Sequence, residues 1–190
     1  MRHYHDRDFN QPAIKLFPGE YYTCREDVLI VTVLGSCIAV CLMDERSQVY
    51  GMNHFLLPNS QRTDSTQTVA SYGINAMELM INSMMKLGAV RKEFKAKVFG
   101  GANVSVHIQQ SRIGSLNSVF ILDYLKAEGI PVIAKDILGE NARRVCFFTG
   151  TGKVNVKKIP IDSTLSIISE EKSLSSTLTL DSKAGSVDLF

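Results

Sequence analysis

The sequence has no excess of charge of one sign, and this bears first on what the protein binds. Its 190 residues include 21 Lys and Arg and 19 Asp and Glu, which gives a net charge of +2. Domains that bind nucleic acid usually carry a basic stripe or patch on one face. No basic stripe with interleaved aromatic residues runs along this chain. We therefore expect no nucleic acid partner.

A long hydrophobic run is also missing. The most apolar stretch, residues 28–43, falls short of the roughly 18 residues that suggest a membrane span, and Gly35 and Ser36 interrupt it. The first stretch, MRHYHDRDFNQPAIK, is polar and lacks the apolar core of a signal peptide. We predict a cytoplasmic protein that does not insert directly into the membrane.

Cysteine is scarce, with four residues at positions 24, 37, 41 and 146. Without an export signal these are expected to be reduced thiols rather than a disulfide framework. With 45% hydrophobic residues the chain is long enough to build a core without such bonds. We predict one domain over residues 14–161, a flexible arm over 1–13 and a flexible Ser/Thr-rich tail over 162–190.

Strand and helix patterns alternate along this domain. Apolar residues at helical spacing predict helices over residues 69–85 and 113–128. Runs bounded by turn residues predict strands at 28–34, 38–43, 48–56, 95–104, 131–138, 143–150 and 153–160, with a short one within 15–23. The early strands are close enough to form hairpins. The fold class is therefore α/β of the α+β type, with layered mixed, partly antiparallel sheets flanked by helices.

The stretch VTVLGSCIAVCLMDERSQVYGMNHFLLP contains the strongest candidate site, formed by Cys37 and His54. If residues 38–43 and 48–56 form a hairpin with a two-residue loop or a four-residue loop at 44–47, Cys37 lies directly opposite His54. Opposed residues share a face, with Cβ atoms about 4.5–5.5 Å apart. A three-residue loop would place them on opposite faces.

Neighbouring residues could complete such a site. A turn at Gly35-Ser36 lets backbone N–H groups point outward, where they could hold an oxyanion. If this turn pairs residue 34 with Cys37, Thr32 falls on the same face as Cys37 and could orient the imidazole. The imidazole would then depress the thiol pKa and supply thiolate at neutral pH.

Other interpretations stay open at this point. A cysteine in an apolar strand is usually a core residue, and a histidine in a strand is usually structural. Cys37, Cys41 and His54 could also be metal ligands, but without a second pair they make a weak zinc signal. The FGGAN turn lacks the pattern of a phosphate or dinucleotide loop. We predict neither a cofactor nor a metal.

Four motifs together resemble the chemoreceptor glutamine deamidase (CheD) family of bacterial chemotaxis. They are LGSCIAVCLMD, MNHFLLP, KVFGGAN and NARRVCFFTGTGKVNVKKI, and the ending GSVDLF resembles that of longer members. The resemblance covers roughly residues 15–160. It implies a cysteine-hydrolase fold similar to that of deamidating bacterial toxins, with Cys37 as nucleophile, His54 as base and Thr32 as third member.

The resemblance also implies a reaction and partners. The expected reaction converts receptor glutamine side chains to glutamate, and the same acyl-enzyme chemistry extends to glutamate methyl esters. The expected partners are methyl-accepting chemotaxis receptors, met along their helical cytoplasmic region at a shallow open site, and a CheC-type phosphatase. The alternatives are a non-catalytic module that docks on these proteins, or another thiol enzyme such as a protease or a transglutaminase.

Overall fold

Two five-stranded sheets form the frame of the molecule, which we describe from a computed structural model for residues 1–57, 66–103 and 111–160. The first, sheet I, has the strand order β1 (Arg2–Asp6), β2 (Gln11–Lys15), β4 (Leu29–Leu34), β9 (Arg143–Phe148) and β10 (Lys153–Lys158). The second, sheet II, has the order β3 (Tyr21–Cys24), β6 (Val49–Asn53), β5 (Ile38–Asp44), β7 (Lys95–Gly100) and β8 (Val132–Ile137). Pairing is antiparallel except for β2 with β4 and β7 with β8.

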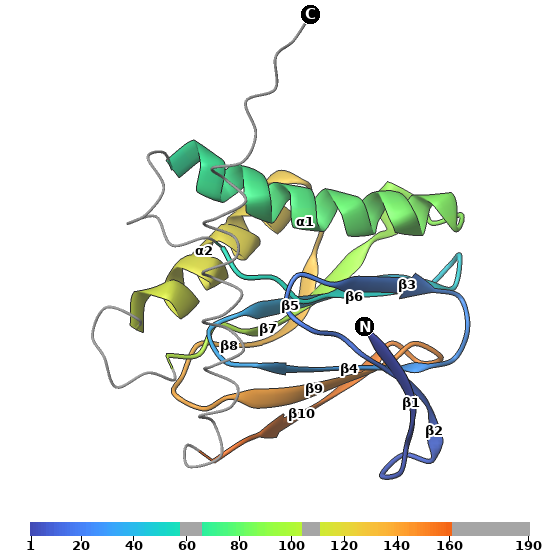
Figure 1. The fold of residues 1–190 in the computed structure, drawn as a ribbon. Coiled ribbons are helices and arrows are strands. Elements are labelled where there is room, and N and C mark those ends of the chain that lie inside the picture. Colours follow the sequence, from blue (N-terminus) through green and yellow to red (C-terminus); the bar gives the residue numbers. More distant parts are fainter. Residues whose placement is uncertain (58–65, 104–110, 161–190) are drawn as a thin grey trace, which may run out of the picture.

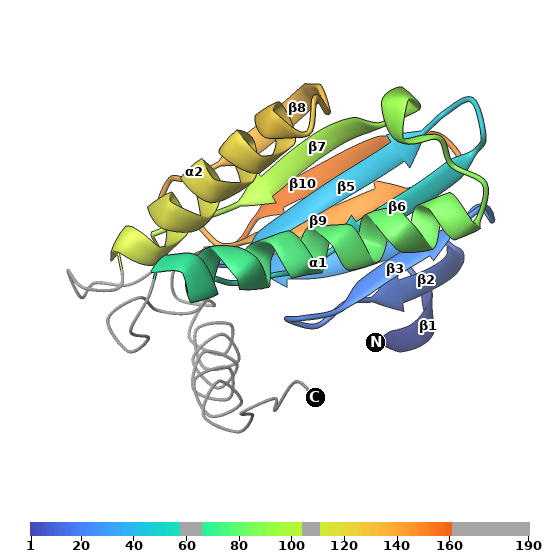
Figure 2. The same cartoon turned by 90° about the horizontal axis from the view of Figure 1, so that it is seen from above.

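The molecule has three layers, with both helices on one side (Figure 1). Helices α1 (Thr66–Lys86) and α2 (Ser111–Ala127) cover the upper face of sheet II, and sheet I packs beneath it. Seen from above, α1 lies on the β3 and β6 side of sheet II and α2 on the β7 and β8 side (Figure 2). A single 3-10 turn, Arg91–Glu93, leads into β7 within the described part of the chain. This is the mixed α/β class with partly antiparallel sheets and flanking helices that the sequence predicts.

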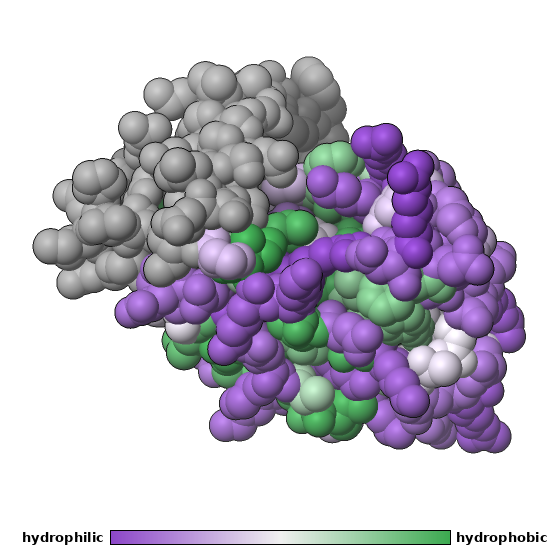
Figure 3. Space-filling view, turned by 90° about the horizontal axis from the view of Figure 1, so that it is seen from below, coloured by the Kyte–Doolittle hydropathy of each residue, from purple (hydrophilic) through white to green (hydrophobic). Residues whose placement is uncertain are grey.

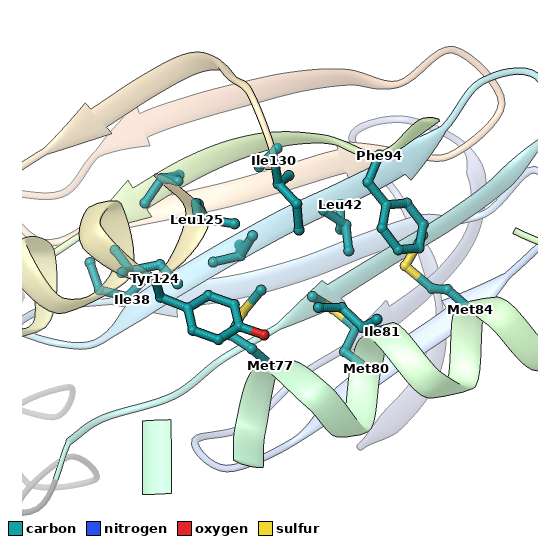
Figure 4. Packing of buried hydrophobic residues seen from close by; sticks show 14 of the residues in the cluster. Ile38, Leu42, Met77, Met80, Ile81, Met84, Phe94, Tyr124, Leu125 and Ile130 are labelled. Atoms are coloured by element: carbon teal, nitrogen blue, oxygen red, sulfur yellow. The ribbon is translucent and has the colours of Figure 1, made fainter. Parts of the chain in front are cut away.

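Apolar residues at helical spacing place one face of α1 on sheet II. Met77, Met80 and Met84 are fully buried there and pack toward Leu42 and Phe94 (Figure 4). Methionine suits this layer because its flexible side chain fills irregular gaps. Met85, which extends the same pattern, is 43% exposed, so the apolar face of α1 is narrower than the pattern indicates.

A second core lies between the two sheets. Alternate residues of β5, including Ala39, Cys41 and Met43, face downward into it. Ile30 and Leu34 of β4 face upward from sheet I into the same layer. Strand alternation therefore assigns each hydrophobic residue of β5 to one of two cores, above or below sheet II.

The outer face of sheet I carries a smaller buried cluster formed by Ala13, Leu29, Val31 and Cys146, whereas β10 is more exposed. On β10, Val154 and Val156 pack against the core between the sheets, while Lys153 and Lys157 are exposed. Viewed from below, the described surface is mostly hydrophilic with smaller hydrophobic areas (Figure 3). No helix in the described residues is long and apolar enough to cross a membrane.

Residues 1–13, predicted as a flexible arm, instead form β1 and most of β2. This hairpin forms one edge of sheet I, and the rings of Phe9 and Phe148 meet edge to face with centroids 5.0 Å apart. Asp6 and Asp8 also pair with Arg144 of β9. The polar composition of the arm hides these few anchoring contacts, which explains the error. The predicted tail, residues 162–190, lies outside the described residues.

Candidate active site

Thr32, Cys37 and His54 meet in the layer between the two sheets. Thr32 lies on β4 between Ile30 and Leu34, so it faces sheet II. Cys37 immediately precedes β5 and belongs to the same buried cluster. His54 follows β6 and shares the parity of Met52, which faces sheet I. The structure thus places the three residues on which the sequence hypothesis rests in one layer.

Thr32 and His54 are joined directly. The Thr32 hydroxyl lies 2.7 Å from Nδ1 of His54 and donates a hydrogen bond of 3.0 Å to the Leu16 carbonyl oxygen. A hydroxyl has a single hydrogen, so toward His54 it acts as the acceptor. Nδ1 of His54 therefore carries the proton in the neutral ring. This tautomer leaves Nε2 as the basic nitrogen of the imidazole.

The predicted direct opposition of Cys37 and His54 is wrong by two positions. Ile38 exchanges both backbone hydrogen bonds with Phe55, each 2.9 Å long, and this register places Cys37 opposite position 56. Asp44 pairs with Val49, so the four-residue loop begins one residue later than predicted. A shift of two keeps every side chain on its predicted face. Cys37 and His54 are consequently diagonal neighbours, with Cβ atoms typically roughly 7 Å apart.

The Gly35-Ser36 turn does not close a hairpin, contrary to the prediction. β4 belongs to sheet I and β5 to sheet II, so these residues carry the chain from one sheet to the other. Thr32 approaches His54 because the two sheets are stacked with their inner faces together. The prediction that Thr32 and Cys37 share one face is therefore wrong: they approach the same layer from different sheets.

The glycine turn after β7 packs against the backbone of this connection. The Gly101 N–H donates to the Cys37 carbonyl, and the Ala102 N–H donates to the Gly35 carbonyl, both at 2.8 Å. A Cβ on Gly100 would lie 2.1 Å from the Cys37 carbonyl oxygen, and Gly100 has a φ of +112°. Only glycine fits there. The FGGAN motif therefore supports the segment that carries the cysteine.

A buried arginine supports the same region from sheet I. Arg143, which is 1% exposed, pairs with Asp136 at 2.6 Å and donates to the carbonyls of Asp136 and Leu138. The Leu138 N–H in turn donates to the Gly100 carbonyl at 2.9 Å. Sequence reasoning missed Arg143, since an arginine in a strand pattern is normally a surface residue.

Sequence reasoning also missed Asn117 of α2. Its side chain is fully buried, and its amide group donates to the Ser36 carbonyl at 2.8 Å. Its one signal in the sequence is position: Asn117 stands four residues before Ile121 and so interrupts the apolar face of α2.

Burial distinguishes this structure from the expected shallow, open site. Cys37 and Thr32 are fully buried and His54 is 2% exposed. Burial also raises the thiol pKa of the other three cysteines, that of Cys24 to about 11. Those three thiols are therefore protonated at neutral pH, and the structure supports them as core residues.

The zinc interpretation is not supported in the described residues. Cys37 and Cys41 do share the face of β5 that looks toward sheet I. Even so, no group of three His, Cys, Asp or Glu side chains among the described residues could hold a metal ion.

Cysteine, histidine and a hydroxyl residue in one layer are the residue types of a thiol hydrolase, and comparison with known proteins identifies the family. The family model described as CheD chemotactic sensory transduction matches residues 56–158. The chain belongs to the CheD family.

Its relatives match over almost the whole chain. A "Probable chemoreceptor glutamine deamidase CheD 1" of Shewanella oneidensis is 47% identical over 98% of this chain and 92% of its own length. A protein of the same name from Dechloromonas aromatica is 44% identical over 98% and 93%. A "CheD 2" of Chromobacterium violaceum is 50% identical over 82% and 78%. Among solved structures, a hypothetical protein YfiH of Bacillus licheniformis aligns over 63% of this chain and 51% of its own, with a TM-score of 0.39 and 11% identity.

Proposed function

We propose that this protein deamidates glutamine side chains of methyl-accepting chemotaxis receptors, with Cys37 as nucleophile, His54 as acid and base, and Thr32 as the residue that orients His54. The names of its relatives support the reaction. The observation that carries the site is the hydrogen bond between Thr32 and His54 in the layer that also holds Cys37.

Acylation comes first. Nε2 of His54 takes the thiol proton of Cys37, and the thiolate attacks the carboxamide carbon of glutamine. The backbone N–H groups of the Gly35-Ser36-Cys37 segment hold the oxyanion of the tetrahedral intermediate. The C–N bond then breaks, the imidazolium gives its proton to the departing ammonia, and a thioester remains on Cys37.

Deacylation uses the same groups. Nε2 of His54 takes a proton from water, whose oxygen attacks the thioester carbon. The C–S bond breaks, the imidazolium returns a proton to the thiolate, and glutamate is released. One water is consumed and one ammonia is formed. A glutamate methyl ester would pass through the same thioester with methanol as the leaving group, so receptor methylesterase activity belongs to the same proposal.

The first experiment follows conversion of glutamine to glutamate in a receptor cytoplasmic fragment by mass spectrometry. We expect conversion by the natural protein and none by Cys37→Ala. Cys41→Ala is the matched control, because Cys41 is a fully buried cysteine on the same face of β5. It should keep its activity.

The alternative is a non-catalytic module that binds receptors or a CheC-type phosphatase. Equal conversion by Cys37→Ala and the natural protein would reject Cys37 as nucleophile. Absence of conversion by the natural protein, with receptor binding retained, would favour the module. A pull-down with receptor fragment and with a CheC-type phosphatase would show which of these partners it holds.

A further inference from the structure

Asn117 connects the two segments that carry the proposed nucleophile and base. Its Nδ2 donates to the Ser36 carbonyl at 2.8 Å, and its Oδ1 accepts from the Leu57 N–H at 3.0 Å. Ser36 immediately precedes Cys37, and Leu57 stands three residues after His54. The side chain is fully buried, and the chemistry proposed above does not use it.

The bond to Ser36 fixes the plane of one peptide. In a trans peptide the C=O and N–H point in opposite directions across a rigid plane. The C=O of the Ser36–Cys37 peptide is directed at Asn117, so the Cys37 N–H points away from α2. That N–H belongs to the proposed nucleophile itself and is one of the donors proposed to hold the oxyanion.

The carbonyls on either side accept from backbone N–H groups. The Gly35 carbonyl accepts from Ala102, and the Cys37 carbonyl accepts from Gly101. The middle carbonyl, that of Ser36, accepts from the side chain of Asn117. A substitution at position 117 therefore acts directly on this peptide.

Helix α2 gives Asn117 a rigid support. A Cβ on Gly101 would lie 2.1 Å from the Ser118 hydroxyl oxygen, and a Cβ on Gly114 would lie 2.5 Å from the Gly101 carbonyl oxygen. The Ser118 hydroxyl donates to the Gly114 carbonyl at 2.8 Å within the helix. The helix thus packs closely on the glycine turn. This packing fixes the backbone position from which the Asn117 side chain extends.

We infer that Asn117 is a positioning residue that sets the Cys37 N–H as an oxyanion donor. This inference rests on the proposed role of Cys37. It assigns to α2 an indirect part in the reaction, because Asn117 positions the Cys37 N–H and touches no substrate atom. Loss of an oxyanion donor typically costs about 100- to 1,000-fold in kcat.

Asn117→Asp is the sharpest variant, because it keeps the shape of the side chain. One carboxylate oxygen can still accept from the Leu57 N–H. The other would face the Ser36 carbonyl oxygen, and repulsion between the two should turn the peptide. We expect kcat for receptor deamidation to fall about 100-fold, with KM changed by less than about threefold because no substrate contact is lost.

Alkylation of Cys37 by iodoacetamide provides a second readout. It distinguishes a positioning role of Asn117 from a purely structural one. In this reaction the thiolate displaces iodide from carbon, and no oxyanion forms. Asn117→Asp should therefore keep an alkylation rate within about threefold of the natural protein, because only steps that form an oxyanion lose stabilisation. Thr149→Val controls for stability. The buried Thr149 hydroxyl accepts from the Val28 N–H and donates to the Glu26 backbone carbonyl, just beyond the end of β9. It should lower the melting temperature with kcat retained.

Two outcomes would overturn the inference. In one, Asn117→Asp deamidates at the natural rate. In the other, its deamidation and alkylation rates fall together, as for a disturbed fold. Failure of the proposed site would look different: Cys37→Ala would then retain deamidation, whatever the Asn117 variant does.

Discussion

Thr32 and His54 belong to different sheets, and a hydrogen bond of 2.7 Å joins them across the layer between the sheets. The Thr32 hydroxyl gives its hydrogen to the Leu16 carbonyl, so its bond to His54 selects one ring tautomer. The orientation of the proposed base is thus set by a strand that lies apart from it in the sequence.

Thr32→Val should test this relationship. Valine keeps the branched shape but cannot accept from Nδ1 of His54, so the imidazole loses its fixed tautomer. A positioned acid or base typically contributes about 100- to 10,000-fold in rate. Because Thr32 only orients the base, we expect part of this contribution to be lost, with kcat falling about 10- to 100-fold. The measurement is the pH profile of kcat/KM with a receptor fragment.

Thr32→Ser is the matched control for this substitution. It keeps a hydroxyl that can bond to Leu16 and His54, so it should keep most of the activity. If the valine and serine variants are equally active, Thr32 does not orient the base.

Selective alkylation is a second prediction. Burial raises the thiol pKa of Cys24 to about 11, and it also raises that of Cys41 and Cys146. At pH 7 a thiol with a pKa near 11 is ionised in about one molecule in 10,000. Because we propose that His54 takes the proton of Cys37, iodoacetamide at pH 7 followed by peptide mapping should label Cys37 first. Faster labelling of any other cysteine in the folded protein would contradict a reactive Cys37.

Arg143→Met should destabilise the fold strongly. The change removes the guanidinium donors of the buried Arg143 and leaves the partly buried carbonyls of Asp136 and Leu138 without them. Each buried polar group left without a partner costs about 1–3 kcal/mol, so we expect a loss of about 3 kcal/mol in the free energy of unfolding. Urea denaturation measures it.

The neighbouring Arg144 provides the comparison. It pairs with Asp6 and Asp8 on the outer face of sheet I and is 27% exposed. Arg144→Met should cost about 1 kcal/mol or less, as for other partly exposed ion pairs. Equal losses for the two variants would show that the Arg143 contacts add nothing beyond an ordinary ion pair.

The pH dependence of stability should reflect Asp44 at the end of β5. Burial acts to raise the pKa of this carboxyl, but the N–H groups of Val90, Ser47 and Arg46 outweigh it and lower the pKa below its ordinary value. A carboxyl with a lowered folded pKa stabilises the fold above its unfolded pKa, about 3.9, and loses this contribution as the pH falls through the folded pKa.

Asp44→Asn isolates this contribution. The amide group would meet backbone N–H donors, so we expect a loss of about 1–2 kcal/mol at pH 7. The difference from the natural protein should shrink as the pH drops below about 4. Unfolding curves at several pH values measure it, and a difference independent of pH would reject the assignment.

Much of the fold could be predicted from the sequence because its strands are apolar and its helices keep regular spacing. The positions of β4, β5 and α2 follow from these local patterns. The assignment of β4 and β5 to different sheets does not, because a Gly-Ser turn can close a hairpin or carry the chain between layers. Only packing between distant strands decides that.

In the candidate site, the faces on which the side chains lie could be predicted, but the register and the contacts between distant segments could not. Strand alternation along β5 and β6 places Cys37 and His54 on one face, and a shift of the pairing by two residues leaves them there. The register itself depends on where the loop begins, which Asp44 decides by accepting from Arg46 and Ser47. The roles of Arg143 and Asn117 depend on contacts with backbone carbonyls, and no local pattern in the sequence records those.

The stacking of the two sheets has a consequence for how the protein becomes able to react. Sheet I supplies Thr32, and sheet II is flanked by Cys37 and His54, so a chain with one sheet formed holds an incomplete set. The imidazole is fixed only when the second sheet closes over the first. Incompletely folded or damaged copies would therefore carry an unreactive thiol. The proposed site would become active only when both sheets have packed together.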